Sequence, residues 1–212
     1  MEQIDGQITD ISGKNSKELY DSLDYNKWIK LIDINETIAF DNYDKKNLFI
    51  KVADIVLDDD KTPSNKKCRQ TLIKFVPTIS KDEYSNKKTE WLYAFVLNGK
   101  LVKLGGSRTG LLGRTSSYLC GHHIEERGKS GSCSNTNAFI YNTFLFYLEL
   151  DCNIEMYGYK LPKSIAKIKI LDEEIETIVQ SYHIYEGKFI ADFKKKYKIK
   201  PILCNNYDHD VE

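Results

Sequence analysis

Two apolar runs separated by Asn98-Gly99 give the clearest structural signal in the chain. Residues 92–97 and 100–104 are mostly apolar, with Tyr93, Phe95, Val96 and Val102 among them, and they flank this pair. Asn-Gly is the preferred pair for a two-residue type I′ turn, so the pattern predicts a β-hairpin. Gly105-Gly106 is expected to end the second strand.

Apolar periodicity predicts further elements on both sides of the hairpin. The segment 48–57 is apolar enough for a strand or a buried helix, and the pattern does not separate the two. The remaining predictions are a Ser-capped helix at 16–30, a helix at 109–120, a loop at 128–134, a helix at 135–150, paired strands at 154–161 and 165–171, and a long helix that opens at Asp172 and stops before Pro201.

This order of elements predicts an α+β (α/β) fold. We expect a small domain at residues 91–206, with a β-hairpin or short central sheet flanked by helices. Residues 1–90 would form an N-terminal extension, and residues 207–212 a polar tail.

Composition indicates a globular protein that works in water. Of 212 residues, 41% are hydrophobic and 29% are charged, which is typical of a chain with a sizeable core. The longest mostly apolar run, residues 138–150, is too short to span a bilayer, and residues 1–5 lack the features of a secretory signal. The five cysteines are irregularly spaced. We therefore expect a cytoplasmic protein with reduced thiols and no membrane partner.

Positive charge is concentrated in one window of a neutral chain. The formal net charge is zero, but residues 91–131 hold six basic side chains against two acidic ones. A local basic field of this kind fits a phosphate site better than general binding of polyanions.

The hairpin and the following helix carry groups suited to a phosphodiester. Tyr93 and Lys103 are expected to face each other on adjacent strands, where the ammonium would lower the phenol's pKa and let Tyr93 act as a general base. Arg114 can grip two phosphate oxygens, and Tyr118, four residues later, lies on the same helix face. Glu186 is an oxygen ligand suited to one Mg²⁺ ion, with Mn²⁺ as an alternative. Each residue alone is more typical of core or surface, so the hypothesis rests on their joint occurrence.

The same residues resemble the motifs of the GIY-YIG nucleases. Leu92-Tyr93-Ala94 stands where the first tripeptide would end, and Lys103-Leu104-Gly105 stands at the second. Arg114 and Tyr118 match the helix motif that follows, and Glu186, Pro201 and Asn205 match the later Glu, Pro and Asn in order. The lysine in place of the second-motif tyrosine resembles one type II restriction-enzyme branch of this superfamily.

The resemblance implies a Mg²⁺-dependent endonuclease that cleaves double-stranded DNA at a specific site. Tyr93, Lys103, Arg114, Tyr118 and Glu186 would be catalytic, with Glu186 holding the metal. One site per chain implies a homodimer for cutting both strands, and a cognate DNA methyltransferase is the expected companion of a restriction enzyme. The expected DNA contacts are Ser107, Arg108, His122, Lys129 and Asn205, although Arg108 fits a solvent-exposed position equally well. Residues 1–90 would supply DNA-recognition or dimer contacts.

Three alternatives stay open from the sequence. The protein fits a mobile-element or DNA-repair endonuclease, although residues 1–90 show no obvious DNA-binding module. It also fits a catalytically inactive DNA-binding protein. Cys120, His122, His123 and Cys133 suggest a zinc site, but their spacing matches no standard finger or ribbon.

Overall fold

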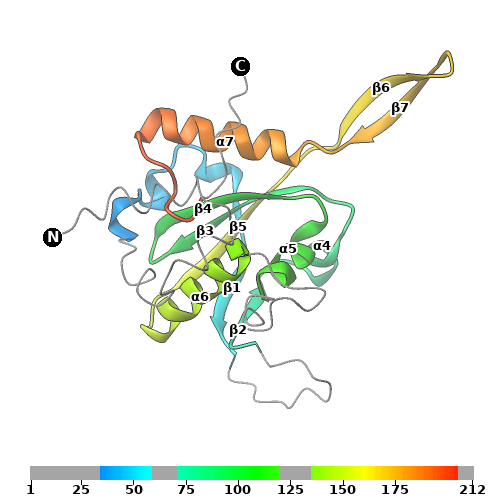
Figure 1. Cartoon of the computed structure of the whole chain (residues 1–212). Coiled ribbons are helices and arrows are strands. Elements are labelled where there is room, and N and C mark those ends of the chain that lie inside the picture. Colours follow the sequence, from blue (N-terminus) through cyan, green and yellow to red (C-terminus); the bar gives the residue numbers. More distant parts are fainter. Residues whose placement is uncertain (1–33, 59–70, 120–134, 205–212) are drawn as a thin grey trace, which may run out of the picture.

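A five-stranded antiparallel sheet forms the centre of the molecule (Figure 1). The computed structural model describes residues 34–58, 71–119 and 135–204. The strand order is β2-β1-β5-β3-β4, which leaves β2 and β4 at the edges. The strands are β1 (Ile50–Leu57), β2 (Ile73–Pro77), β3 (Trp91–Leu97), β4 (Lys100–Ser107) and β5 (Ile154–Lys160).

Helices cover both faces of this sheet. The elements α5 and α6 contribute to a core on one face, and α7 with the short helices near residue 40 contributes to a core on the other. The prediction of an α+β domain with a central sheet flanked by helices is confirmed. The helices are α4 (Lys81–Ser85), α5 (Gly110–Leu119), α6 (Asn135–Glu149) and α7 (Tyr182–Tyr197), with 3₁₀ turns η2 (Ile34–Glu36), η3 (Phe40–Asn42) and η4 (Lys46–Leu48).

Strand β3 is buried at every position. It pairs with β4 on one side and with β5 on the other. Its alternate side chains enter different cores: Tyr93 and Phe95 face α5 and α6, whereas Leu92 and Ala94 face α7. A strand buried on both faces reads as a continuous apolar run, as this one does.

The predicted hairpin is confirmed, but its second strand is longer than expected. Asn98 and Gly99 have φ values of 46° and 76°, as a type I′ turn requires. Strand β4 continues through Gly105 and Gly106 to Ser107, because both glycines keep their ladder partners on β3. The predicted helices at 109–120 and 135–150 are confirmed as α5 and α6.

Sheet pairing also decides the segment that the sequence left open. Residues 50–57 form a strand, β1, which lies between β2 and β5. The sheet therefore crosses the predicted domain boundary at residue 90. The predicted helix at 16–30 and the loop at 128–134 lie outside the described residues.

Two predictions for the C-terminal half are wrong. Residues 154–160 and 164–170 are strands, but they do not pair with each other: β5 joins the central sheet, and β6 (Ser164–Ile170) pairs with β7 (Glu173–Val179). The long helix begins at Tyr182 and not at Asp172. Residues 175, 178 and 179 have helical spacing, but pairing with β6 aligns Ile175 with Ile168 and overrides that periodicity.

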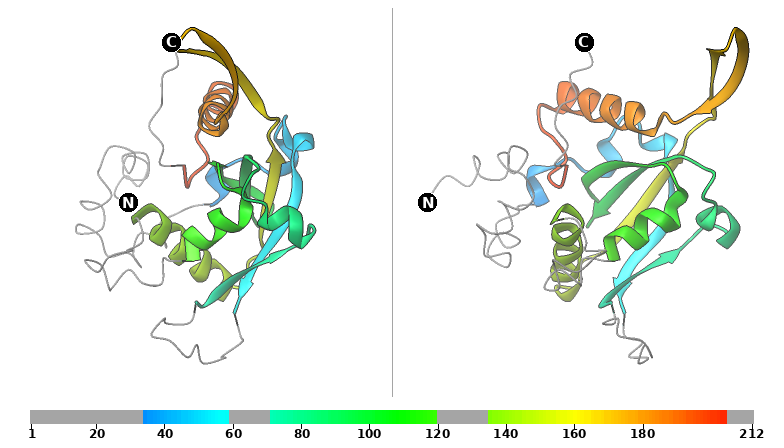
Figure 2. Two further views of the ribbon diagram at one scale, coloured as in Figure 1. Left: turned by 90° about the vertical axis from the view of Figure 1, so that its right-hand side faces the viewer. Right: turned by 45° about the vertical axis from the view of Figure 1, so that its right-hand side comes forward.

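The β6–β7 hairpin forms an arm that extends away from the central sheet (Figures 1 and 2). Its base is fixed by Glu90, whose carboxylate accepts hydrogen bonds from the Ser181 backbone N–H (2.9 Å) and hydroxyl (3.1 Å). Ser164 and Ser181 join their hydroxyls at 3.1 Å. Strand β6 and helix α7 are thus tied to the residue just before β3.

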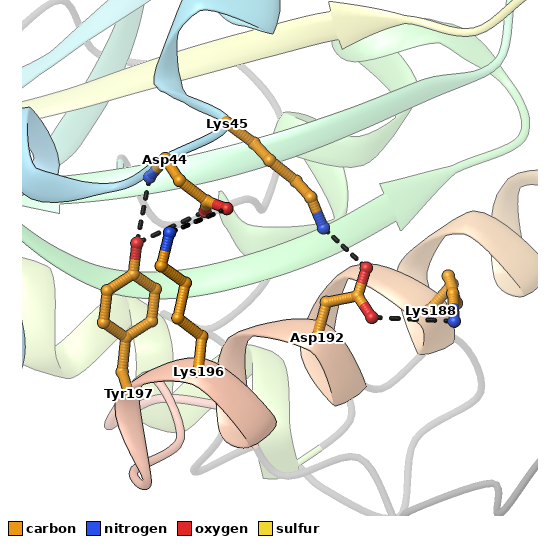
Figure 3. A network of polar contacts seen from close by, with 6 residues as sticks. All are labelled: Asp44, Lys45, Lys188, Asp192, Lys196 and Tyr197. Atoms are coloured by element: carbon orange, nitrogen blue, oxygen red, sulfur yellow. Dashed lines mark hydrogen bonds and ion pairs between the residues drawn. The ribbon is translucent and has the colours of Figure 1, made fainter.

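Ion pairs attach α7 to the segment before β1 (Figure 3). Lys45 binds Asp192 at 2.6 Å, and Lys196 binds Asp44 at 3.1 Å. Tyr197 accepts a hydrogen bond from the Asp44 backbone N–H at 2.9 Å. These contacts join residues about 150 positions apart in the sequence and fix one face of the helix that carries Glu186. Within the described residues, no helix is both long enough and apolar enough to cross a membrane.

Replacing Phe95 by alanine should test the core on the α5–α6 side. The ring is fully buried and contacts the rings of Tyr93, Tyr118 and Phe144. We expect Phe95→Ala to lower the free energy of unfolding by about 3–5 kcal/mol in urea denaturation. Leu150→Ala is the exposed control, with an expected change within about 0.5 kcal/mol. Equal effects of the two substitutions would contradict the assignment.

Candidate active site

Two buried phenols and one guanidinium meet between β3 and α5. The Tyr93 and Tyr118 hydroxyl oxygens lie 2.6 Å apart. Arg114 donates from Nε to the Tyr93 oxygen and from a terminal nitrogen to the Tyr118 oxygen, each at 2.8 Å. Both tyrosines are completely buried, whereas Arg114 is partly exposed. We call these three residues the phenol–guanidinium cluster.

The start of α5 fixes where the cluster's helix residues lie. Gly110 has φ +76°, and a side chain there would overlap the Asn86 carbonyl, so this position favours glycine. Ser107, a predicted DNA contact, is buried and donates to the Gly110 carbonyl at 2.6 Å. Because Arg114 and Tyr118 lie one turn apart on this helix, both reach the tip of Tyr93.

Burial dominates the charge state of Tyr93. It raises the pKa of this phenol well above 10, with smaller contributions in the same direction from Tyr118 and Glu186. The Arg114 guanidinium opposes this rise in pKa. In the cluster one phenol donates to the other, and Arg114 donates to both oxygens, so a phenolate formed here would accept charge-assisted hydrogen bonds.

Two adjacent glycines on β4 bring Tyr93 and Glu186 to the same point of the strand. A Cβ on Gly105 would overlap the Tyr93 hydroxyl. A Cβ on Gly106 would lie 2.8 Å from a Glu186 carboxylate oxygen and 2.7 Å from the Tyr182 ring. Successive strand residues face opposite sides of a sheet, so the phenol and the carboxylate approach this strand from its two faces.

Lys103 lies elsewhere than expected. The register pairs Tyr93 with Gly105 and Lys103 with Phe95, so the expectation that Tyr93 and Lys103 face each other is wrong. Even an uninterrupted ladder from the Asn98-Gly99 turn would pair Tyr93 with Leu104, and a bulge beside Phe95 adds one further residue to β4. Lys103 is 3% exposed, and its ammonium donates to the Leu203 carbonyl at 3.0 Å. The cation that contacts Tyr93 is Arg114.

The other predicted site residues divide into placed and unplaced ones. Arg108 is exposed just after β4. His122, Lys129 and Asn205 lie outside the described residues, as do the zinc candidates Cys120, His123 and Cys133. Across the part of the chain that the structure describes, no three His, Cys, Asp or Glu side chains are grouped to hold a metal. Glu186 is partly exposed and remains a candidate for a site that uses few protein ligands.

Sequence reasoning missed Tyr182 and the spatial role of the two glycines. Tyr182 lies one turn before Glu186 on α7, and both side chains pack on Gly106. The spacing of 182 and 186 was a signal for a shared helix face.

Comparison with known proteins supports the fold. No family model and no curated protein matches the chain. Among solved structures, the chain is similar to restriction endonuclease HPY188I in complex with product DNA, at 23% identity over 82% of this chain and 90% of that one, with a TM-score of 0.50. It is also similar to a mutant of bacteriophage T4 EndoII, at 19% identity over 74% and 96% of the two chains, with a TM-score of 0.47. The first comparison shows that the chain shares its fold with a restriction endonuclease.

The buried phenol predicts a specific pH dependence of stability. In the unfolded chain Tyr93 ionises near pH 10, about its usual value, whereas its folded pKa is higher. The stabilisation from its neutral form is therefore complete below about pH 10 and is lost as the pH rises toward the folded pKa. Urea denaturation should show that the wild type's advantage over Tyr93→Phe shrinks between about pH 8 and about pH 10.5. An advantage that stays constant would contradict the raised pKa.

Proposed function

We propose that this protein is an endonuclease that hydrolyses phosphodiester bonds in double-stranded DNA. Within that class we propose a site-specific type II restriction enzyme of the GIY-YIG superfamily. The observation that carries the proposal is the phenol–guanidinium cluster beside the β4 glycines, with Glu186 on the adjoining face. The fold shared with a restriction endonuclease that was solved with product DNA supports it.

Tyr93 is the proposed general base. Its hydroxyl already accepts from Arg114 at 2.8 Å and shares a short hydrogen bond with Tyr118. Loss of its proton to solvent leaves a phenolate that the Arg114 guanidinium stabilises, and this phenolate can then take a proton from the attacking water. Arg114 rather than Lys103 is the cation placed to favour that ionised form, which revises the role expected for Lys103.

Arg114 and Tyr118 are proposed to bind the scissile phosphate. A guanidinium presents several donors in a fixed plane, so Arg114 can contact a phosphate oxygen while it keeps a phenol contact. Its partial exposure gives a ligand access to it. Tyr118 is fully buried in the free protein and orients Tyr93 and Arg114 there, so its own contact with the phosphate requires the cluster to open when DNA binds.

Glu186 is proposed to hold one Mg²⁺ ion, or Mn²⁺ in its place. A single carboxylate fits an ion that keeps most of its waters, and the absence of a Cβ at Gly106 leaves its carboxylate room on the β4 side. When bound, such an ion would polarise the phosphate and stabilise the leaving oxygen. The partners that follow are double-stranded DNA, a second copy of the chain and a cognate DNA methyltransferase, with Arg108 as a backbone contact.

Digestion of a sequenced plasmid tests the proposal directly. Incubation with Mg²⁺ should give double-strand breaks at one short sequence, which sequencing of the ends would define. Nicks at branched or damaged DNA instead would favour the repair or mobile-element alternative. Tight DNA binding with every plasmid and phage DNA left intact would favour the inactive DNA-binding protein and overturn the enzyme assignment.

Glu186→Gln should remove cleavage and leave DNA binding in place. The amide keeps the size of the side chain but removes the charge that would hold the ion. We expect cleavage to fall by at least about 100-fold, with an unchanged dissociation constant in a gel-shift assay without metal. Glu83→Gln, in an exposed ion pair with Lys160, is the matched control. Cleavage that survives in Glu186→Gln would refute the metal assignment.

Arg114→Lys should impair the site although it keeps the positive charge. An ammonium cannot donate to both phenol oxygens in the guanidinium's planar geometry. We expect a loss of roughly 100-fold or more in the cleavage rate, measured in single-turnover reactions on cognate DNA. Arg108→Lys is the control at an exposed arginine, and its effect should be small. Similar losses in both variants would indicate a general charge effect.

A further inference from the structure

The outer edge of β4 is covered along most of its length, although β4 is the last strand of the sheet. The segment before β1 covers one end: the Leu101 N–H donates to the Ile38 carbonyl at 3.0 Å, and the Leu101 carbonyl accepts from the Thr37 hydroxyl at 2.6 Å. Further along the strand, the Leu203 N–H donates to the Val102 carbonyl at 2.8 Å. These contacts satisfy the edge as an additional strand would, and they protect it from pairing with another chain.

Two side chains complete this cover near the middle of the strand. The Cys204 thiol accepts from the Leu104 N–H at 3.2 Å and donates to the Leu104 carbonyl at 3.3 Å. The thiol therefore takes the place of a neighbouring strand's backbone. The Lys103 ammonium donates to the Leu203 carbonyl at 3.0 Å and holds the same segment on the edge. The cover that the described residues provide ends at Leu104.

The next outward-directed backbone groups of β4 belong to Gly106. Along an edge strand of an antiparallel ladder, alternate residues direct their N–H and C=O groups to the neighbouring strand and away from it. Because Leu104 directs both groups outward, Gly106 does the same. No described residue accepts from the Gly106 N–H. From Leu101 to Ser107, Gly106 is the one residue of the strand that is not buried.

A gap of this size fits one small group better than a peptide strand. A strand that adds to a sheet edge pairs with several outward N–H and C=O groups in a row. Gly105 and Ser107, on either side of Gly106, direct their backbone groups to β3 by the same alternation. Neither glycine has a side chain that would keep a ligand away from the backbone. One accessible N–H at such a position is a donor suited to an anionic oxygen.

The groups around Gly106 favour a phosphodiester as the source of that oxygen. On one face of the strand the Tyr93 hydroxyl lies at Gly105 and accepts from Arg114 at 2.8 Å, and on the other face the Glu186 carboxylate lies at Gly106. The carboxylate without a metal ion would repel an anion. The partly exposed Arg114 guanidinium and the metal ion proposed at Glu186 supply the opposite charge. A phosphate in the plane of the sheet beside Gly106 would therefore lie between a cation on each face.

We propose that the backbone N–H of Gly106 donates a hydrogen bond to a non-bridging oxygen of a DNA phosphate at the uncovered edge of β4. This contact rests on the proposed function and adds a backbone donor to the same site. It also revises the DNA contact expected from this strand. The Ser107 hydroxyl is occupied by the Gly110 carbonyl at 2.6 Å, and the group that β4 offers to DNA is the backbone N–H of the preceding residue.

Nuclear magnetic resonance of the full chain tests for this hydrogen bond directly. Gly105-Gly106 is the only Gly-Gly pair in the sequence. In protein made with glycine labelled at its nitrogen and its carbonyl carbon, the Gly106 amide is therefore the one that follows a labelled carbonyl. The titrant is a short DNA duplex selected for binding from a random pool, with Ca²⁺ in place of Mg²⁺.

On addition of this duplex, the Gly106 amide proton should shift downfield and show a scalar coupling to phosphorus. The Gly187 amide is the control on α7, where the space around the glycine is open, and it should show no coupling. A Gly106 amide without a coupling when the duplex is saturating would overturn the proposal. A coupling to inorganic phosphate but not to the duplex would also overturn it, because it would indicate a site for free anions.

Replacing the Gly106 amide by an ester measures what the contact contributes to binding. Glycolic acid at position 106, introduced by nonsense suppression in cell-free synthesis, removes the N–H and adds no side chain. The dissociation constant for the same duplex should rise at least about tenfold, and the midpoint of urea denaturation should stay at the wild-type value because no described residue uses this N–H. The same replacement at Gly105 removes an N–H that faces β3, so it should lower the midpoint instead. Unchanged DNA affinity, or a lower midpoint, in the Gly106 ester contradicts the proposal.

Neither measurement uses cleavage, so this contact and the proposed function can fail separately. A phosphorus coupling at Gly106 in a protein that leaves every plasmid intact would support the contact and remove the enzyme assignment. Site-specific cleavage by a protein whose Gly106 amide shows no coupling would support the enzyme assignment and remove the contact.

Discussion

The burial of β3 on both of its faces and along both of its edges is the constraint on which the rest of the structure depends. Every residue from Trp91 to Leu97 is buried. Such a strand can satisfy its backbone only through two ladder partners and its side chains only through two separate cores. The helices on the two faces of the sheet therefore pack against opposite sides of the same strand. This packing fixes the position of the Tyr93 side chain relative to both cores.

A single bulge converts this scaffold into a site. In an uninterrupted ladder from the Asn98-Gly99 turn, Tyr93 would lie opposite Leu104. The bulge beside Phe95 moves Gly105 to that position, and Gly105 is where a side chain would overlap the phenol oxygen. The extra residue therefore gives the Tyr93 hydroxyl space at the outer strand, where Arg114 reaches it.

Sequence patterns captured local elements and missed non-local pairing. The Asn-Gly hairpin and helices α5 and α6 follow from short-range signals that the fold preserves. The position of Lys103 depends on a bulge in β4, and residues 173–179 form a strand because they pair with β6. Short-range sequence patterns predict neither the bulge nor the pairing. The spacing of Arg114 and Tyr118 was predictable because it needs only a helix. Their contact with Tyr93 needed the register of β4 and the packing of α5.

The edge position of β4 explains how groups from two cores act at one place. Tyr93 belongs to the core beneath α5, whereas Glu186 extends from α7 on the opposite face. In the middle of a sheet, flanking strands would separate such groups. At the edge strand β4, only the strand's own backbone lies between the Tyr93 hydroxyl and the Glu186 carboxylate. Gly105 and Gly106 have no side chains that would hold these two groups further apart. Glu186 accordingly contributes to the raised pKa of Tyr93 across this strand. A cation bound by Glu186 would act on the phenol through the same short path with the opposite sign, and would lower its pKa.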